Sequence, residues 1–222
     1  MIQFRKAGWL VCLATLAFSA KPAWAAEDKM TGGVEIGVNI TSASIGGTDA
    51  TGIHSSVLSG LMVGGTLQYA VTDVVSIQPE FQYSQKYFKV YAPGSGPGSF
   101  TQNEHLDVFE LPVLLRLNFP HGKSGPGFYA VMGPGFGYNL RARETKVVDS
   151  GKSQPDRNAN ADFNKGRYSI IGGAGIATGK VDFEARYESE LRNLLNGSPS
   201  TGNATARDHG VTVLLRFNFK NK

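Results

Sequence analysis

The sequence has 222 residues, of which 41% are hydrophobic and 18% are charged, with a formal net charge of +4 and a single cysteine, Cys12. One cysteine excludes a fold held by disulfide bonds, and the small excess of positive charge gives no argument for nucleic acid as a partner. The length is that of one domain, which must be held together by its own packing.

The first 25 residues have the pattern of a secretory signal peptide. Arg5 and Lys6 precede an apolar run over residues 8–18, and an Ala-Trp-Ala sequence ends at Ala25. An N-terminal membrane anchor is the alternative, but the run is shorter than the roughly 20 residues that a spanning helix needs. We therefore expect a signal peptide over 1–25 and one domain over 26–222. Cleavage would remove Cys12 and three basic residues.

The rest of the chain alternates apolar and polar residues with a period of two, which predicts strands. In Ser76–Ser84, for example, Ile77, Phe81 and Tyr83 share one face, and Gln78, Glu80 and Gln82 share the other. Eight segments have this character and are long enough to cross a bilayer as tilted strands. In chain order they are 34–41, 58–71, 76–84, 107–119, 127–141, 167–178, 181–195 and 211–219.

The connections between these segments alternate in length. Those over 44–57, 90–104, 142–165 and 196–208 are long and polar, whereas those over 72–74, 120–126 and 179–180 are short. Long loops at one end and short turns at the other are typical of outer-membrane barrels. The predicted fold is all-β, an eight-stranded antiparallel up-and-down transmembrane β-barrel with both termini in the periplasm.

The segment 181–195 also fits a helix, because Phe183, Tyr187, Leu191 and Leu194 recur at helical spacing. We predict a strand, since a helix would leave seven strands and an open edge in lipid.

A soluble barrel would alternate in the same way, with its apolar face inside. Glycines on the charged faces favour the membrane barrel, because they would make room for long side chains in a narrow lumen. These glycines are Gly37, Gly60, Gly64, Gly133, Gly135, Gly137, Gly173 and Gly175.

The charged residues on the inward faces form the candidate site. They are Glu35, Glu80, Glu110, Arg116, Glu184, Arg186, Glu188 and Arg216. We interpret them as a structural network of paired charges that fills the lumen, because eight strands enclose little more than side chains; a polar passage is the alternative. If Val181 lies opposite Phe219, Glu184 lies directly opposite Arg216.

Candidate catalytic chemistry is weak. The four histidines, His54, His105, His121 and His209, lack metal-ligand spacing. A Ser-His-acid set at the outer rim could arise from His54 with Ser55, from His105 beside Glu104, or from His209 beside Asp208, but loops rich in serine and aspartate produce such neighbours by chance. The glycine run over 172–181 departs from a phosphate-binding loop. We predict no catalytic, cofactor-binding or metal-binding residues.

Three stretches resemble the PorT-like family of outer-membrane β-barrel proteins. SIQPEFQYSQK (Ser76–Lys86) is similar to its "LQPE-x-x-YSQKG" pattern, ELPVLLRLNF (Glu110–Phe119) to its "E-I-P-L-L-L-K" strand, and GAGI with VDFEARY (Gly173–Tyr187) to a hairpin that ends in "LEARY". The resemblance implies an eight-stranded barrel in the outer membrane of a diderm bacterium. It implies no particular activity, because such a barrel is a scaffold.

The expected function is that of a non-enzymatic outer-membrane protein with a structural or surface-binding role through its long loops. A narrow pore and a lipid-modifying barrel enzyme are the alternatives; bilayer conductance would identify the first and lipid turnover the second. Expected partners are outer-membrane lipid, the barrel assembly machinery, and an extracellular ligand or envelope partner that the sequence does not identify. We expect a monomer, no cofactor and no nucleic acid.

Overall fold

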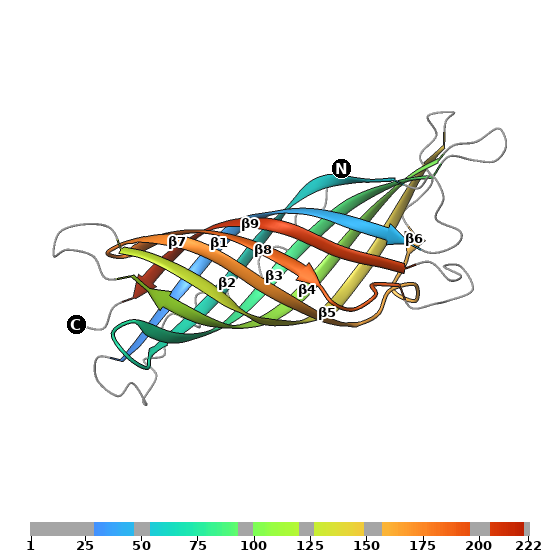
Figure 1. Ribbon diagram of the computed structural model, residues 1–222. Helices are drawn as coiled ribbons and strands as arrows, with labels where there is room; N and C mark the ends of the chain where they lie inside the picture. Colours follow the sequence, from blue (N-terminus) through green and yellow to red (C-terminus); the bar gives the residue numbers. More distant parts are fainter. Residues whose placement is uncertain are drawn as a thin grey trace, which may run out of the picture.

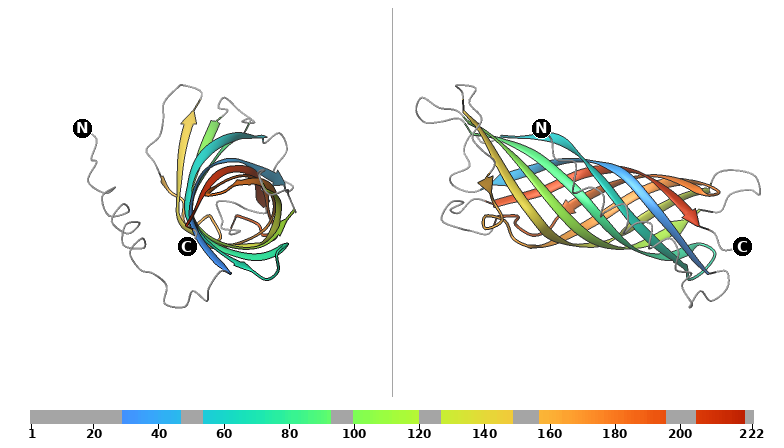
Figure 2. Two further views of the ribbon diagram at one scale, coloured as in Figure 1. Left: turned by 90° about the vertical axis from the view of Figure 1, so that its left-hand side faces the viewer. Right: turned by 180° about the vertical axis from the view of Figure 1, so that it is seen from behind.

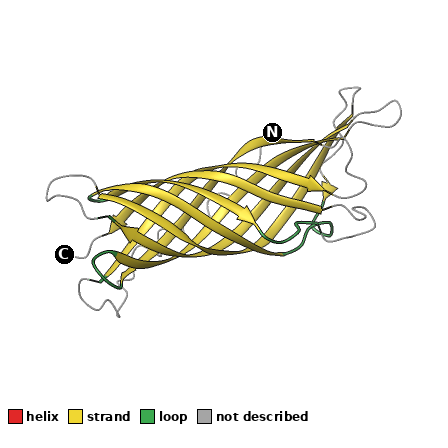
Figure 3. Ribbon diagram, in the orientation of Figure 1, coloured by secondary structure: helices red, strands yellow, loops and turns green. Residues whose placement is uncertain are grey.

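The computed structural model describes residues 29–46, 54–92, 100–119, 127–148, 157–195 and 205–219. These residues form long strands and connecting turns, with no helix among them (Figures 1 and 3). The strands are β1 (Met30–Gly46), β2 (His54–Ala70), β3 (Val75–Ala92), β4 (Phe100–Asn118), β5 (Gly127–Val148), β6 (Arg157–Asn158), β7 (Gly166–Thr178), β8 (Val181–Glu190) and β9 (Thr205–Phe219).

Eight of these strands close into an antiparallel barrel. Each pairs with its neighbours in the order β4-β3-β2-β1-β9-β8-β7-β5, and the β4–β5 pairing closes the ring (Figure 2, left). The two-residue β6 adds only to the far end of β5. The predicted fold is therefore confirmed. Within the described residues, no helix has the length and apolarity to cross a membrane.

The two ends of the barrel differ. At one end, here called the turn end, Val71 and Thr72 donate backbone hydrogen bonds to the carbonyl of Val75 and close the β2–β3 connection. Gly179 and Lys180 make the β7–β8 turn, where Gly179 has a φ of 73°, a backbone conformation that glycine adopts without strain. The opposite end, here called the loop end, carries β6 and the ends of the longest strands (Figure 1).

The barrel is polar inside and apolar outside. Outward-facing side chains such as Ile36, Phe81 and Val213 are about half exposed, whereas inward-facing Glu35 and Arg216 are each 1% exposed. A soluble barrel would have the reverse arrangement, since water rather than lipid would meet its outer face. This distribution excludes the soluble alternative.

The ambiguous segment is a strand only in its first part. Val181–Glu190 forms β8, as predicted, but 191–195 leaves the barrel wall. The predicted register of the last hairpin is wrong by two residues. Val181 pairs with Phe217 rather than Phe219, so Arg216 lies directly opposite Asp182, and Glu184 lies opposite Leu214.

The predicted loops are too long, because the strands continue into them. β1 runs to Gly46, β3 to Ala92 and β5 to Val148, and β9 already begins at Thr205. Parts of the four long loops lie outside the described residues, namely 47–53, 93–99, 149–156 and 196–204. The predicted signal peptide and the connection over 120–126, which contains His121, also lie outside them.

Candidate functional site: the charged lumen

Two arginines and three glutamates form the centre of the lumen. Arg186 on β8 donates from Nη1 and Nη2 to the two carboxylate oxygens of Glu80 on β3, each at 2.6 Å, and from Nε to Glu184. Arg216 on β9 lies 3.1 Å from Glu35, 3.0 Å from Glu80 and 3.1 Å from Glu184. Two-pronged arginine–carboxylate pairs of this kind are among the stronger hydrogen-bonded contacts in proteins.

The pair between Arg186 and Glu80 crosses the whole lumen. Three strands separate β3 from β8 in either direction around the ring, so the two residues project from opposite walls. Gln82 fills the space beside them, donating at 2.8 Å to Glu35 and at 2.7 Å to Glu80. The side chains therefore meet in the middle of the barrel.

A second group closes the lumen toward the turn end. Arg116 on β4 pairs with Asp182 on β8 at 2.8 Å, and its guanidinium lies 3.5 Å from the centre of the Tyr129 ring. The Tyr129 hydroxyl donates to Glu184 at 2.8 Å, which links this group to the central one. Gly175 permits this packing, since a Cβ atom there would collide with the ring of Tyr129.

A third group lies toward the loop end. The Lys86 ammonium on β3 is 2.8 Å from both Glu110 on β4 and Glu188 on β8, so it too joins opposite walls. Arg167 on β7 pairs with Asp208 on β9. Lys86 and Arg167 are each almost fully buried, and so depend on these partners.

Above the third group, an apolar cluster closes the mouth at the loop end. Phe163 and Leu194, from the connections beyond β6 and β8, are buried against inward-facing residues of the strands, and Phe163 meets Phe88 edge to face. We call this cluster the apolar cap; it consists of Ala43, Phe88, Leu106, Val108, Ala142, Ala159, Phe163, Leu194 and Ala206. The apolar cap was not predicted from the sequence, because Leu194 was assigned to a strand of the barrel wall.

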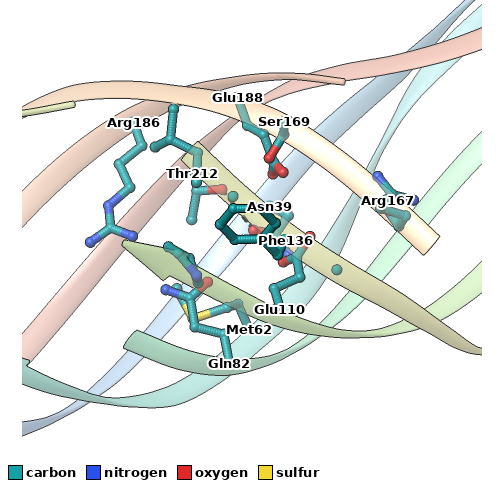
Figure 4. Close-up of a pocket in the computed structure, with 14 residues that line it drawn as sticks. Asn39, Met62, Gln82, Glu110, Phe136, Arg167, Ser169, Arg186, Glu188 and Thr212 are labelled. Atoms are coloured by element: carbon teal, nitrogen blue, oxygen red, sulfur yellow. Dashed lines mark hydrogen bonds between the residues drawn. The ribbon is translucent and has the colours of Figure 1, made fainter. Parts of the chain in front are cut away.

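A small cavity remains between the central and loop-end groups (Figure 4). Asn39, Gln82, Arg186 and Glu188 are among the residues that line it, and its volume of about 20 Å³ is enough for a single water molecule. The lumen is thus packed with side chains at this level as well.

The structure places all eight predicted site residues inside the barrel. Each makes at least one ion pair with an inward-facing partner. Glu184 and Arg216 are in contact at 3.1 Å although they are not directly opposite, because long side chains reach diagonal positions.

Sequence reasoning missed several members of the network, namely Lys86, Arg167, Asp182, Glu190 and Asp208. Glu190 pairs with Arg167 at 2.7 Å. The signal was the same alternation, continued toward the strand ends: Lys86 follows Gln82 and Ser84 at even positions, and Asp208 precedes Gly210 and Thr212. The predicted strands 76–84 and 211–219 were too short to include Lys86 and Asp208. Arg167, Asp182 and Glu190 lay within predicted strands but were not assigned to the inward charged set.

The two serine-histidine-acid candidates on described side chains, beside His105 and His209, do not form a triad. His209 contacts Ser44 at 3.4 Å on the outward face, whereas Asp208 points into the lumen and pairs with Arg167. His105 contacts Asp107 at 3.0 Å, and it stacks on Tyr87. The side chains of His54 and Ser55 lie outside the described part. Among the described residues, no group of three or more His, Cys, Asp or Glu side chains is arranged to hold a metal ion.

The sequence of this barrel matches a family of known outer-membrane sequences. A family model described as the outer membrane protein beta-barrel domain matches residues 27–196. The chain belongs to this family. Its location is accordingly the bacterial outer membrane, and the outward apolar faces of the family's barrel domain meet lipid.

Several solved outer-membrane protein structures match this chain at low sequence identity. Ail, the attachment invasion locus protein of Yersinia pestis, is 11% identical, with 86% of this chain and 100% of that chain covered at a TM-score of 0.41. OprG from Pseudomonas aeruginosa is 13% identical, with 86% and 95% covered at a TM-score of 0.44. Neisserial surface protein A is 12% identical, with 86% and 100% covered at 0.42. No curated protein matches the sequence.

Proposed function

We propose that this protein is a non-enzymatic, non-conducting outer-membrane barrel that acts at the cell surface through its long loops. The observation that supports the proposal is the filled lumen. Ion pairs join opposite walls at two levels, between Arg186 and Glu80 and between Lys86 and Glu188. Ions would have to displace these pairs and then pass the apolar cap, so a narrow pore is disfavoured.

The positions of the histidines argue against the enzyme alternative. A barrel enzyme needs a nucleophile, a base and an orienting carboxylate within hydrogen-bond reach of one another. His209 and its serine lie on the outer face, while the neighbouring carboxylate serves the charge network inside. Conversion of outer-membrane lipid by the purified protein would contradict a non-enzymatic role.

We also propose that the chain is a PorT-like member of its family, on the basis of where its motifs lie. The pattern SIQPEFQYSQK places Gln78, Glu80, Gln82 and Lys86 in the lumen, where each makes a hydrogen bond or ion pair. The motif VDFEARY contributes Asp182, Glu184 and Arg186. These motifs therefore specify lumen packing, so a resemblance in them bears on architecture more than on activity.

A surface role requires the loop end to face outward. We expect an epitope tag inserted at Ser153 to be labelled by antibody on intact cells, and a tag at Lys123 to be labelled only after the outer membrane is opened. Both positions lie outside the described residues, in the β5–β6 and β4–β5 connections. The opposite labelling pattern would place the loops in the periplasm and contradict the proposed role.

A further inference from the structure

A second cavity lies in the barrel wall rather than in the lumen. Its volume is about 140 Å³, large enough for a group of benzene size. It lies beside β5 at residues whose side chains point in opposite directions: Tyr138 and Leu140 face outward, and Asn139 and Ala142 face inward. A cavity that touches both faces of one strand must pass around the edge of that strand.

Between Tyr138 and Arg143, one edge of β5 has no continuous strand partner, because its partner changes from β7 to β6. Pairing with β7 stops at Tyr138 and Gly166, and pairing with β6 starts at Arg143 and Asn158. Between these points the edge is held by separate hydrogen bonds, from the Asn139 backbone to the carbonyl of Lys165 and from the Ala142 backbone to the side chain of Asn160. The result is a notch in the wall, leading from the outer face to Phe163 of the apolar cap.

One residue that lines the notch, Asn139, has a buried side-chain acceptor with no hydrogen-bond partner among the described residues. Asn139 is only 8% exposed, and its side-chain Nδ2 donates a hydrogen bond to the carbonyl of Asn164 at 2.6 Å. That hydrogen bond fixes the orientation of the amide, so Oδ1 is the free end. Within the described residues, Oδ1 has no hydrogen-bond partner. An unpaired buried acceptor favours a ligand that carries a hydroxyl or an amide N–H.

Positive charge stands at the outer rim of the same notch. Lys165 lines it and is exposed. Arg192 is also exposed; it lies 3.4 Å from the carbonyl of Gly166 and over the ring of Tyr168. Lys165 lines the notch together with the outward-facing Tyr138, and Arg192 lies over the outward-facing Tyr168. Aromatic residues on the outer face of such barrels lie at the level of the lipid headgroups, so both cations lie near that level.

We propose that the notch binds a phosphorylated glycolipid of the outer leaflet. The phosphate lies against Lys165 and Arg192, a hydroxyl or amide N–H near the start of an acyl chain donates to Oδ1 of Asn139, and the chain itself packs on Leu140 and Phe163. The assignment of the leaflet rests on the proposed outward orientation of the loop end. Binding in detergent does not depend on that orientation, so the two proposals can fail separately.

The test uses the purified full-length mature protein in detergent, with binding of a hydroxyacylated, phosphorylated glycolipid followed by native mass spectrometry. Lys165→Glu should weaken binding by about tenfold or more, because it replaces attraction to the phosphate with repulsion. Lys180→Glu is the matched control, since it makes the same charge change on an exposed lysine at the turn end. It should leave binding within about twofold of the unmodified protein. Equal binding by both variants, or equal loss, would overturn the proposal.

Two altered lipids test the remaining contacts. The same glycolipid without its phosphate should bind more weakly than the intact lipid, and should no longer distinguish Lys165→Glu from Lys180→Glu. Phosphatidic acid with chains of equal length has a phosphate but neither hydroxyl nor amide donor, so it should also bind more weakly. Binding of phosphatidic acid as tight as that of the glycolipid would contradict the role of Asn139.

Discussion

Replacing Arg186 with methionine should destabilise the barrel by about 3–5 kcal/mol, the usual cost of breaking a buried ion pair by removing one partner. Methionine keeps much of the side-chain volume, so the loss reflects charge rather than a cavity. The substitution leaves Glu80 and Glu184 as neighbouring carboxylates in a water-poor lumen, with only Arg216 to pair with both. The measurement is the free energy of unfolding in urea, with the protein refolded into lipid vesicles.

Two further variants show whether the pair itself is responsible. The double variant Arg186→Met with Glu80→Gln should lose less stability than the sum of the single variants, because the two residues share one interaction. Arg192→Met removes an exposed arginine on the outer face and should change stability by about 0.5 kcal/mol or less. Strict additivity of the two lumen substitutions would mean that Arg186 and Glu80 do not interact.

A charge introduced on the outer face should also have a large effect on the stability of the barrel. Val213→Arg should destabilise the barrel by about 2–4 kcal/mol in a bilayer, because it places a charge among lipid chains. Val213 is 53% exposed and pairs with Val38 on β1 and Ala185 on β8, in the middle of the outward apolar band. In a soluble barrel the same substitution would place arginine in water, at almost no cost.

A control at the end of a strand tests whether the cost of the arginine depends on its depth in the bilayer. Phe219 is similarly exposed but ends β9 at the turn end, where the bilayer interface lies. Phe219→Arg should therefore cost about 0–1 kcal/mol of charge burial. Equal effects at the two positions, measured by unfolding in the same vesicles, would contradict the placement of Val213 in the hydrocarbon.

The faces of the strands could be predicted from the sequence because the side-chain period of a strand is two. Once Phe183 and Val213 are assigned to lipid, Glu184 and Leu214 must point inward, and the structure agrees. The same period explains why the register was missed. A slip of one residue would turn every side chain to the wrong face, but a slip of two preserves both faces. Alternation therefore cannot distinguish Phe217 from Phe219 as the partner of Val181.

The ends of the strands and the apolar cap could not be predicted for a different reason. Beyond the bilayer the outward residues of a strand meet water, so they need not be apolar, and the alternation that identified β5 up to Arg141 is lost before Val148. Leu194 and Phe163 belong to connections between strands, and only the folded chain brings them against Phe88. Their burial depends on contacts between residues far apart in the sequence.

Ion conductance across a planar bilayer tests most directly whether paired side chains and the apolar cap seal the lumen. Insertion must be verified separately, by the shift in gel mobility between unboiled and boiled protein recovered from the bilayer lipid. With the protein inserted, we predict no stepwise current above that of the lipid alone, because Arg186 and Glu80 bridge the full width of the barrel. Reproducible current steps from the unmodified, correctly inserted protein would contradict a sealed lumen and favour the narrow pore.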